Sequence, residues 1–193
     1  MALSPAPGGE GFFREFPQGA VGAGLAPARA TFATTINRMG LPRRIRLRLG
    51  AAVYAEPGRA FSVTIGTAPR TPVFADVDFG RECVRLLNRR CAETATRCYA
   101  YCLMPDHVHL LVGIGGQASL SAFVGSWKSL CAVARLKRTR SCRFWQRSFF
   151  ERVLRDNEPL NETTLYILAN PIRAELATRI GEYPLAGSLE FEL

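Results

Sequence analysis

The sequence predicts an α+β fold, in which two helices cover an antiparallel sheet and a further helix is added at the C-terminal end. Three observations lead to this prediction. Short runs of β-branched and aromatic residues alternate with two long stretches in which apolar residues recur at helical spacing. Two of the short runs are separated only by a Met-Pro-Asp turn, which is typical of an antiparallel hairpin. A last helical stretch follows the final short run and is interrupted by a proline.

The first half of the folded part is expected to contain a strand, a helix and a hairpin. Residues 60–65 (Ala-Phe-Ser-Val-Thr-Ile) have the composition of a strand. Asp78 is the expected N-cap of a helix over 79–94, because apolar side chains recur there at helical spacing, at Val84, Leu87 and Cys91. Residues 97–103 alternate as a second strand, which the turn joins to a third strand over 107–112.

The second half is expected to contain a helix, a strand and the final helix. Residues 119–138 form the helix, with an apolar face made by Leu120, Phe123, Trp127 and Leu130. Residues 149–154 form the fourth strand, and 158–176 the last helix, interrupted at Pro171. The order βαββαβ is the ferredoxin-like arrangement. Two helices cover one face of such a sheet, and the final helix is expected to cover the other.

The charge of the chain points to a nucleic-acid partner. The formal net charge is +9, and arginine supplies almost all of it, because the only lysines are Lys128 and Lys137. Arginine presents planar, forked donors that match phosphate oxygens and can stack on bases. An arginine-rich surface that merely reflects a GC-rich genome is the alternative.

The composition also limits the compartment. The chain has six cysteines but no Cys-x-x-Cys pair, which predicts reduced thiols rather than a zinc ribbon or a disulfide framework. The sequence contains no apolar run of the length that a membrane span needs and no convincing secretory signal. We therefore expect a cytoplasmic protein without a membrane contact.

The N-terminal region differs from the rest of the chain. Residues 1–38 are rich in Gly, Ala and Pro without a sustained period, so a flexible extension is predicted, followed by a single domain over 39–193. Arg44, Arg46 and Arg48 alternate with aliphatic residues at the start of this domain. In an extended segment they share one side, which predicts a phosphate-contacting edge. A solvated charged surface explains the same pattern.

The two histidines of the chain, His107 and His109, are two residues apart in the third strand. Successive side chains of a strand point to opposite faces, so both imidazoles are expected on one face and Val108, Leu110 and Val112 on the other. A strand can present a pair of nitrogen ligands to one metal ion in this way. For the motif alone, the alternatives are two histidines with a structural role and a zinc or cupin-type site.

Tyr166 and Asn170 are four residues apart in the last helix and therefore share a helical face. Pro171 is expected to loosen the turn around Ile167 and to tilt Asn170 toward a site. A tyrosine that attacks phosphorus needs a cation that polarises the phosphate. We therefore predict a metal ion held by His107, His109 and Asn170, with Tyr166 as the nucleophile. A tyrosine that packs at the edge of the core is the structural alternative for Tyr166 alone.

Other aromatic and basic residues near these motifs have two interpretations each. Tyr99 and Tyr101 lie in the strand next to the histidines and are expected to pack rather than to attack phosphate. The two tryptophans, Trp127 and Trp145, could stack on unpaired bases or be buried. Lys128 could contact a DNA phosphate or be exposed to solvent.

Four sequence blocks resemble the single-tyrosine HUH transposases, and most closely the REP-associated tyrosine transposases. The blocks are Met104–Val112 (MPDHVHLLV), Trp127–Ser129 (WKS), Phe144–Arg152 (FWQRSFFER) and Tyr166–Leu176 (YILANPIRAEL). They span roughly residues 60–180 in the order of the family. The long N-terminal extension and the arginine segment are not part of the shared pattern.

The resemblance implies a metal-dependent endonuclease and strand transferase that acts on single-stranded DNA beside short hairpins. The tyrosine of such enzymes forms a 5′-phosphotyrosine bond and releases a 3′-hydroxyl, which assigns the nucleophile to Tyr166. The metal ligands carry over to His107, His109 and Asn170, and Mg²⁺ or Mn²⁺ is the expected ion. The protein could act as a monomer or as a homodimer. The alternatives are a non-catalytic binder of hairpin DNA or RNA and a hydrolase of small phosphodiesters.

Overall fold

A five-stranded antiparallel sheet with the strand order β4-β1-β3-β2-β5 is the central element of the part of the chain that the structure describes. This computed structural model describes residues 59–154 and 158–191, which all belong to one compact unit, Leu47–Leu193. The predicted extension over 1–38 and the segment with Arg44, Arg46 and Arg48 lie outside the described residues. The described elements, in chain order, are β1 (Ala60–Gly66), a 3₁₀ turn η1 (Val73–Ala75), α1 (Val77–Thr94), β2 (Arg97–Met104), β3 (His107–Gly113), α2 (Leu120–Thr139), β4 (Phe150–Val153), α3 (Leu160–Leu168), α4 (Asn170–Arg173) and β5 (Ala186–Gly187).

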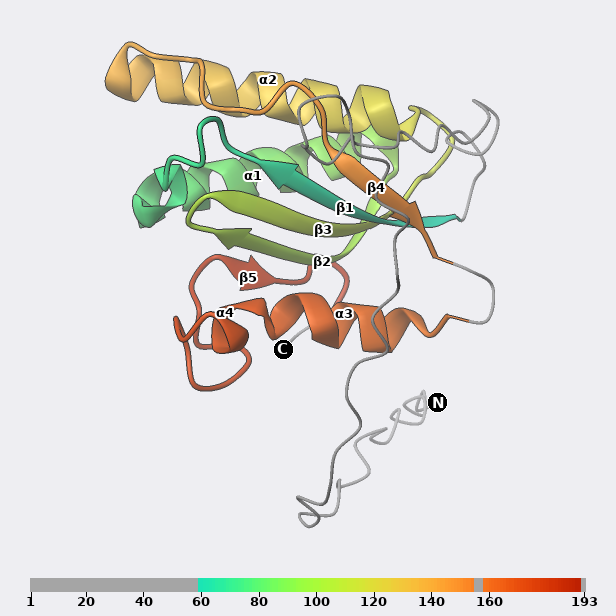
Figure 1. Cartoon of the computed structure of the whole chain (residues 1–193). Coiled ribbons are helices and arrows are strands. Elements are labelled where there is room, and N and C mark those ends of the chain that lie inside the picture. The colour runs from blue at the N-terminus through green and yellow to red at the C-terminus, as the bar shows by residue number, and fades with distance from the viewer. Residues whose placement is uncertain (1–58, 155–157, 192–193) are drawn as a thin grey trace, which may run out of the picture. The chain divides into compact units, whose positions relative to one another are not determined.

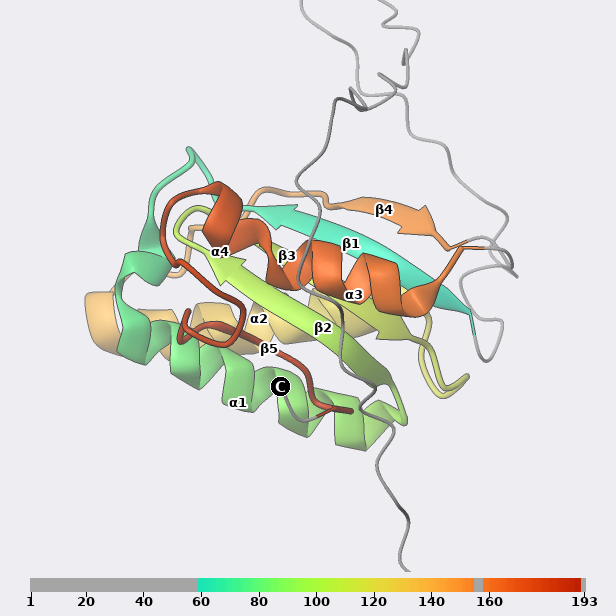
Figure 2. The same ribbon diagram turned by 90° about the horizontal axis from the view of Figure 1, so that it is seen from below.

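The first four strands and two helices confirm the ferredoxin-like prediction. Strand β1 lies between β3 and β4, and β2 pairs with β3 in the predicted hairpin. Helices α1 and α2 lie on one face of the sheet, and α3 and α4 lie on the other (Figures 1 and 2). The last helical region therefore covers the face that the two-helix layer leaves open, as its position in the sequence predicted.

The short strand β5 was not predicted. It pairs with β2 through Tyr101 and Gly187. The hydroxyl of Tyr183 donates a hydrogen bond of 3.0 Å to the carbonyl of Leu103 and holds the C-terminal segment against β2. A strand of two residues is too short for an alternating pattern, so its existence depends on this tertiary contact.

The start of α1 corrects the predicted cap. Asp76, not Asp78, is the N-cap, because its side chain accepts a hydrogen bond of 3.0 Å from the amide of Phe79. Asp78 lies in the first turn of the helix, where its negative charge interacts favourably with the positive end of the helix dipole. Both aspartates suit a helix start by composition, and only the backbone geometry distinguishes the cap.

The final helical region is broken between α3 and α4, at Ala169, and Pro171 is a residue of the first turn of α4. Proline has no amide hydrogen to donate to the carbonyl of Ile167, four residues earlier. The side chain of Asn170 donates to that carbonyl instead, at 2.9 Å. The predicted interruption is therefore present, and the side chain of Asn170 in α4 is hydrogen-bonded to the last turn of α3.

The sheet separates two apolar layers. The larger layer lies between the sheet and helices α1 and α2, and its members include Phe61, Val63, Ile65, Leu87, Val108, Leu110, Phe123 and Trp127. The smaller layer lies under α3 and consists of Ala100, Cys102, Met104, Leu111, Leu154 and Ile167.

Trp127 and the cysteines show how polar groups are accommodated in this core. Trp127 is fully buried, and its indole N–H donates to the carbonyl of Cys83 at 3.0 Å, which confirms the buried interpretation of this residue. All six cysteines are free thiols, and Cys142 is the exposed one.

No helix within 59–154 or 158–191 combines the length and the apolar character that a bilayer crossing requires.

Candidate active site

The two imidazoles lie together on the α3 face of the sheet. Val108 and Leu110 belong to the core under α1 and α2, whereas Leu111 belongs to the core under α3. His107 and His109 share the face of Leu111, because side chains alternate along β3. Their ring centroids are 4.8 Å apart and the rings are nearly perpendicular. This spacing allows both rings to reach one ion.

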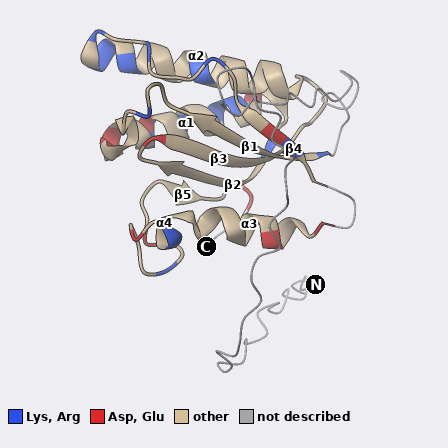
Figure 3. Ribbon diagram, in the orientation of Figure 1, with Lys and Arg blue, Asp and Glu red and all other residues tan. Residues whose placement is uncertain are grey.

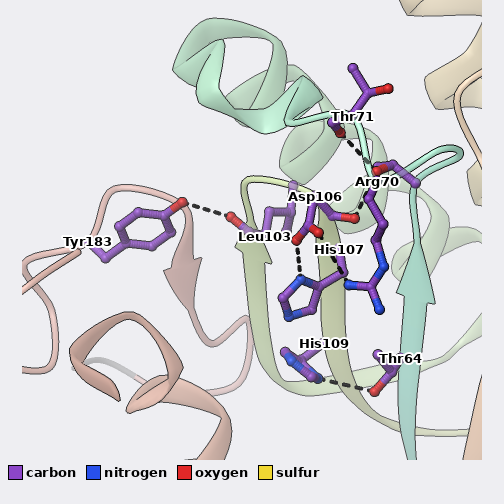
Figure 4. A network of polar contacts seen from close by, with 9 residues as sticks. Thr64, Arg70, Thr71, Leu103, Asp106, His107, His109 and Tyr183 are labelled. Carbon is purple, nitrogen blue, oxygen red and sulfur yellow. Dashed lines mark hydrogen bonds and ion pairs between the residues drawn. The ribbon is translucent and has the colours of Figure 1, made fainter. Parts of the chain in front are cut away.

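Each imidazole uses Nδ1 for a hydrogen bond within the protein (Figure 4). Nδ1 of His107 lies 2.6 Å from Oδ1 of Asp106, and Nδ1 of His109 lies 3.1 Å from Oγ1 of Thr64. Thr64 is directly opposite His109 in the β1–β3 pair. These contacts orient the rings and leave Nε2 of each ring as the nitrogen for a metal ion.

Asp106 is itself held in place. Its Oδ2 accepts a hydrogen bond of 3.2 Å from Arg70, and its carbonyl accepts one of 2.9 Å from the amide of the buried Thr67. Burial raises the pKa of Asp106, but the hydrogen bonds from His107 and Arg70 outweigh this effect and hold that pKa below its usual value. The carboxylate is therefore charged at neutral pH and favours a proton on Nδ1 of His107.

His109 is neutral at physiological pH. Burial, together with the neighbouring His107 and the positive charge of Arg173, lowers the pKa of His109 from 6.5 to about 4. A neutral imidazole is the form that binds a metal ion.

Arg173 connects Tyr166 and Asn170 in a single cluster. Its guanidinium lies over the ring of Tyr166, 4.0 Å from the centroid. It donates hydrogen bonds of 3.1 Å to the carbonyl of Tyr166 and 2.6 Å to Oδ1 of Asn170. Because α3 and α4 lie on the histidine face of the sheet, this cluster is on the same side of the sheet as the imidazoles.

Tyr166 and Asn170 differ in what they contact. The side chain of Tyr166 is 62% exposed, so the phenol is accessible to a large substrate. Oδ1 of Asn170 accepts a hydrogen bond from Arg173, and Nδ2 of Asn170 donates to the carbonyls of Ile167 and Tyr166 in α3. Its described hydrogen bonds do not include the imidazoles, and its role as a third metal ligand stays a prediction.

Lys128 is a partly buried residue that positions a neighbouring segment. Its ammonium donates a hydrogen bond of 2.7 Å to the carbonyl of Gln146, and burial lowers its pKa. The indole N–H of Trp145 donates to the carbonyl of Lys128 at 3.0 Å. Trp145 also packs against Phe74 and Trp127. The contacts of Lys128 with DNA and of Trp145 with bases stay predictions.

Two residues of the site were missed in the sequence. Asp106 directly precedes His107, and Arg173 lies three residues after Asn170, on the same helical face. Neighbouring positions in the two motifs could have suggested both residues. Their partners, however, are decided by side-chain rotamers that a pattern does not contain.

The donors suit a divalent ion with several open positions. Within the described ranges, no cluster of three or more His, Cys, Asp or Glu side chains could hold a metal ion. Two oriented imidazoles with available Nε2 atoms would therefore need amide, water or substrate oxygens to complete the coordination. A structural zinc site, which takes four protein ligands, does not fit this donor set.

Comparisons with known proteins relate the chain to transposases. The family model described as "Transposase IS200 like" matches residues 61–170. A search among curated proteins gave no match. One similar solved structure is the "REP associates tyrosine transposase bound to a REP hairpin", which is 16% identical, with 68% of this chain and 77% of that chain covered and a TM-score of 0.57. Another, from Deinococcus radiodurans R1, is described as a "putative transposase" and is 20% identical, with 56% of this chain and 87% of that chain covered and a TM-score of 0.42.

Proposed function

Because the chain belongs to the IS200-like transposase family, we propose that it cleaves and rejoins single-stranded DNA beside hairpins through a covalent tyrosine intermediate. The observation that supports this proposal most directly is the imidazole pair of His107 and His109. Both Nδ1 atoms are hydrogen-bonded, and both rings lie on the sheet face under the helix of Tyr166.

Tyr166 is the proposed nucleophile. Its phenolic oxygen forms a bond to phosphorus while the bond between phosphorus and the 3′-oxygen breaks. The phenol gives up its proton, and the 3′-oxygen takes up a proton and leaves as a hydroxyl. The product on the protein is a 5′-phosphotyrosine, and attack by a 3′-hydroxyl in the reverse direction joins the strands.

The proposed ion is Mg²⁺ or Mn²⁺, held by His107 and His109. Such an ion supplies charge that polarises the scissile phosphate. In the resemblance to the tyrosine transposases, Asn170 is a further ligand, which requires its Oδ1 to exchange the hydrogen bond of Arg173 for the ion. Arg173 stays over the ring of Tyr166 and limits the orientations of the phenol.

The proposed partner is single-stranded or hairpin DNA. The related solved structure of a REP-associated tyrosine transposase carries a REP hairpin. The formal net charge of +9 favours a nucleic acid, and lysine and arginine gather on α2, on the face of the sheet opposite the histidines (Figure 3). Phosphate contacts on α2 would add affinity without selecting a sequence.

The proposal is tested with a labelled single-stranded oligonucleotide that contains a hairpin. Incubation with Mn²⁺ should give an adduct that survives denaturation and disappears in Tyr166→Phe. Tyr99→Phe is the matched control, because the ring of Tyr99 stacks on Phe191 and its substitution also removes only a hydroxyl. An adduct of equal yield in Tyr166→Phe would refute the nucleophile. If EDTA does not change hairpin binding and no metal ion supports cleavage, the protein is instead a non-catalytic binding protein.

The same assay decides between a monomer and a homodimer that exchanges the tyrosine helix. A mixture of Tyr166→Phe and His107→Ala should regain adduct formation only if one copy supplies Tyr166 to the histidines of another. A mixture without activity, together with an active wild-type monomer, would assign both residues to the same copy.

A further inference from the structure

Gly66 leaves a gap beside His107. The two residues are directly opposite each other in the β1–β3 pair, at the end of β1. Cross-strand partners share a face of the sheet, so a side chain at position 66 would lie on the face of the imidazoles, with its Cβ about 4.5–5.5 Å from that of His107. Glycine has no side chain to occupy this place.

The side-chain amide of Gln146 occupies that gap. A Cβ built on Gly66 would lie 2.8 Å from both Cδ and Nε2 of Gln146 and 3.0 Å from its Oε1. The amide of the Gln146 backbone donates to the carbonyl of Gly66 at 2.9 Å, so the two residues are also joined through the main chain. The glutamine amide therefore lies on the histidine face, next to the position of His107.

The position of Gln146 depends on rigid elements. Lys128 from α2 donates to the carbonyl of Gln146, and the preceding Trp145 donates to the carbonyl of Lys128. Trp145 also forms a β-bridge with Thr67, which follows β1 directly. All these contacts to residue 146 use main-chain atoms, so a substitution of its side chain leaves them in place.

We propose that Gln146 provides an amide oxygen to the divalent ion at His107 and His109, which rests on the function proposed above. Mg²⁺ and Mn²⁺ favour oxygen ligands, whereas the two imidazoles supply nitrogen, and the oxygens of Asp106 and Thr64 are already hydrogen-bonded to the Nδ1 atoms of those rings. The amide oxygen of Asn170 lies on α4 and accepts a hydrogen bond of 2.6 Å from Arg173. Gln146 instead is joined to the end of β1 through its backbone amide and to α2 through Lys128, so its position does not depend on α3 or α4.

Titration of the full chain with Mn²⁺ in the absence of DNA tests the proposal, by calorimetry and by the loss of the free Mn²⁺ resonance. Gln146→Ala should weaken Mn²⁺ binding about tenfold. Gln146→Glu should bind Mn²⁺ at least as tightly as the wild type, because a carboxylate keeps the oxygen and adds charge. Gln117→Ala, in the exposed loop after β3, is the matched control and should not change the affinity.

Gly66→Ala tests the geometry without removing the glutamine. The new methyl group would occupy the place of the amide and push this flexible side chain away, so Mn²⁺ binding should weaken as in Gln146→Ala. The double variant should bind no more weakly than either single variant, because both remove the same contact. Additive losses, or wild-type affinity in Gln146→Ala, would overturn the proposal.

A third variant separates this inference from the function on which it rests. If His107→Ala loses Mn²⁺ binding while Gln146→Ala keeps it, the metal site stands and the role of Gln146 is wrong. If His107→Ala itself binds Mn²⁺ as the wild type does, the metal site proposed above is wrong. Thermal unfolding of each variant shows whether a loss of binding follows from a loss of fold.

Discussion

Replacement of Asp106 by alanine should weaken metal binding without loss of the fold. The carboxylate of Asp106 contacts Nδ1 of His107 at 2.6 Å and Arg70 at 3.2 Å. Partners of this kind orient a ligating imidazole, and their loss costs about 10- to 100-fold in metal affinity. This factor corresponds to about 1.4–2.8 kcal/mol of binding free energy.

The magnitude follows from what the carboxylate does to the imidazole. With Asp106 charged, a proton on Nδ1 of His107 is favoured and the lone pair of Nε2 is available to the ion. Without it, the ring samples both tautomers and additional orientations. The cost to the fold is small, because the carbonyl of Asp106 keeps its hydrogen bond from Thr67 and Arg70 is exposed.

Calorimetric titration with Mn²⁺ measures this effect. Asp78→Ala is the matched control, since it removes the same charge from a side chain that is 79% exposed in the first turn of α1. Asp106→Asn should fall between the wild type and Asp106→Ala, because an amide oxygen still accepts the hydrogen bond but carries no charge. If Asp106→Ala binds Mn²⁺ within about twofold of the control, well short of the expected loss, the orienting role of Asp106 is refuted.

Three further predictions concern other parts of the structure. Trp127→Phe should lower the free energy of unfolding by about 2 kcal/mol, because it leaves a small cavity and removes the donor to the carbonyl of Cys83. Urea titrations measure this change, and an unchanged unfolding midpoint would contradict it. The pKa of His109 is about 4 in the folded chain and 6.5 ordinarily, so only the unfolded chain binds this proton between these values. Stability should therefore fall by up to about 3 kcal/mol as the pH is lowered from 6.5 to 4, and urea unfolding of His109→Gln should show a smaller loss over this range; equal losses would assign the pH dependence to other groups. Arg173→Ala should slow adduct formation by about 10- to 100-fold in a time course, because the ring of Tyr166 loses the guanidinium that lies over it. Arg173→Lys should restore only part of the rate. A wild-type rate in Arg173→Ala would show that Arg173 does not position the phenol.

The order of the elements and the main features of the site could be predicted from local patterns. The period of two along residues 107–112 decides which face His107 and His109 share, and this period is a property of any strand. Helical spacing and the effect of proline on a helix likewise predict the break before Pro171. Such inferences hold because they depend on backbone geometry within a few residues.

Contacts between distant segments required the tertiary structure. The pairing of β1 with β3 brings Gly66 opposite His107, and the segment after α2 then places Gln146 over that glycine. The charge of Arg173 likewise lowers the pKa of His109, although the two residues are far apart in the sequence. No local period encodes such neighbours, because they depend on strand register and on the packing of α3 and α4 against the sheet. The sequence by itself therefore determined which residues are the candidate metal ligands and the candidate nucleophile, because their spacing is local, whereas the folded chain decided which side chains contact them.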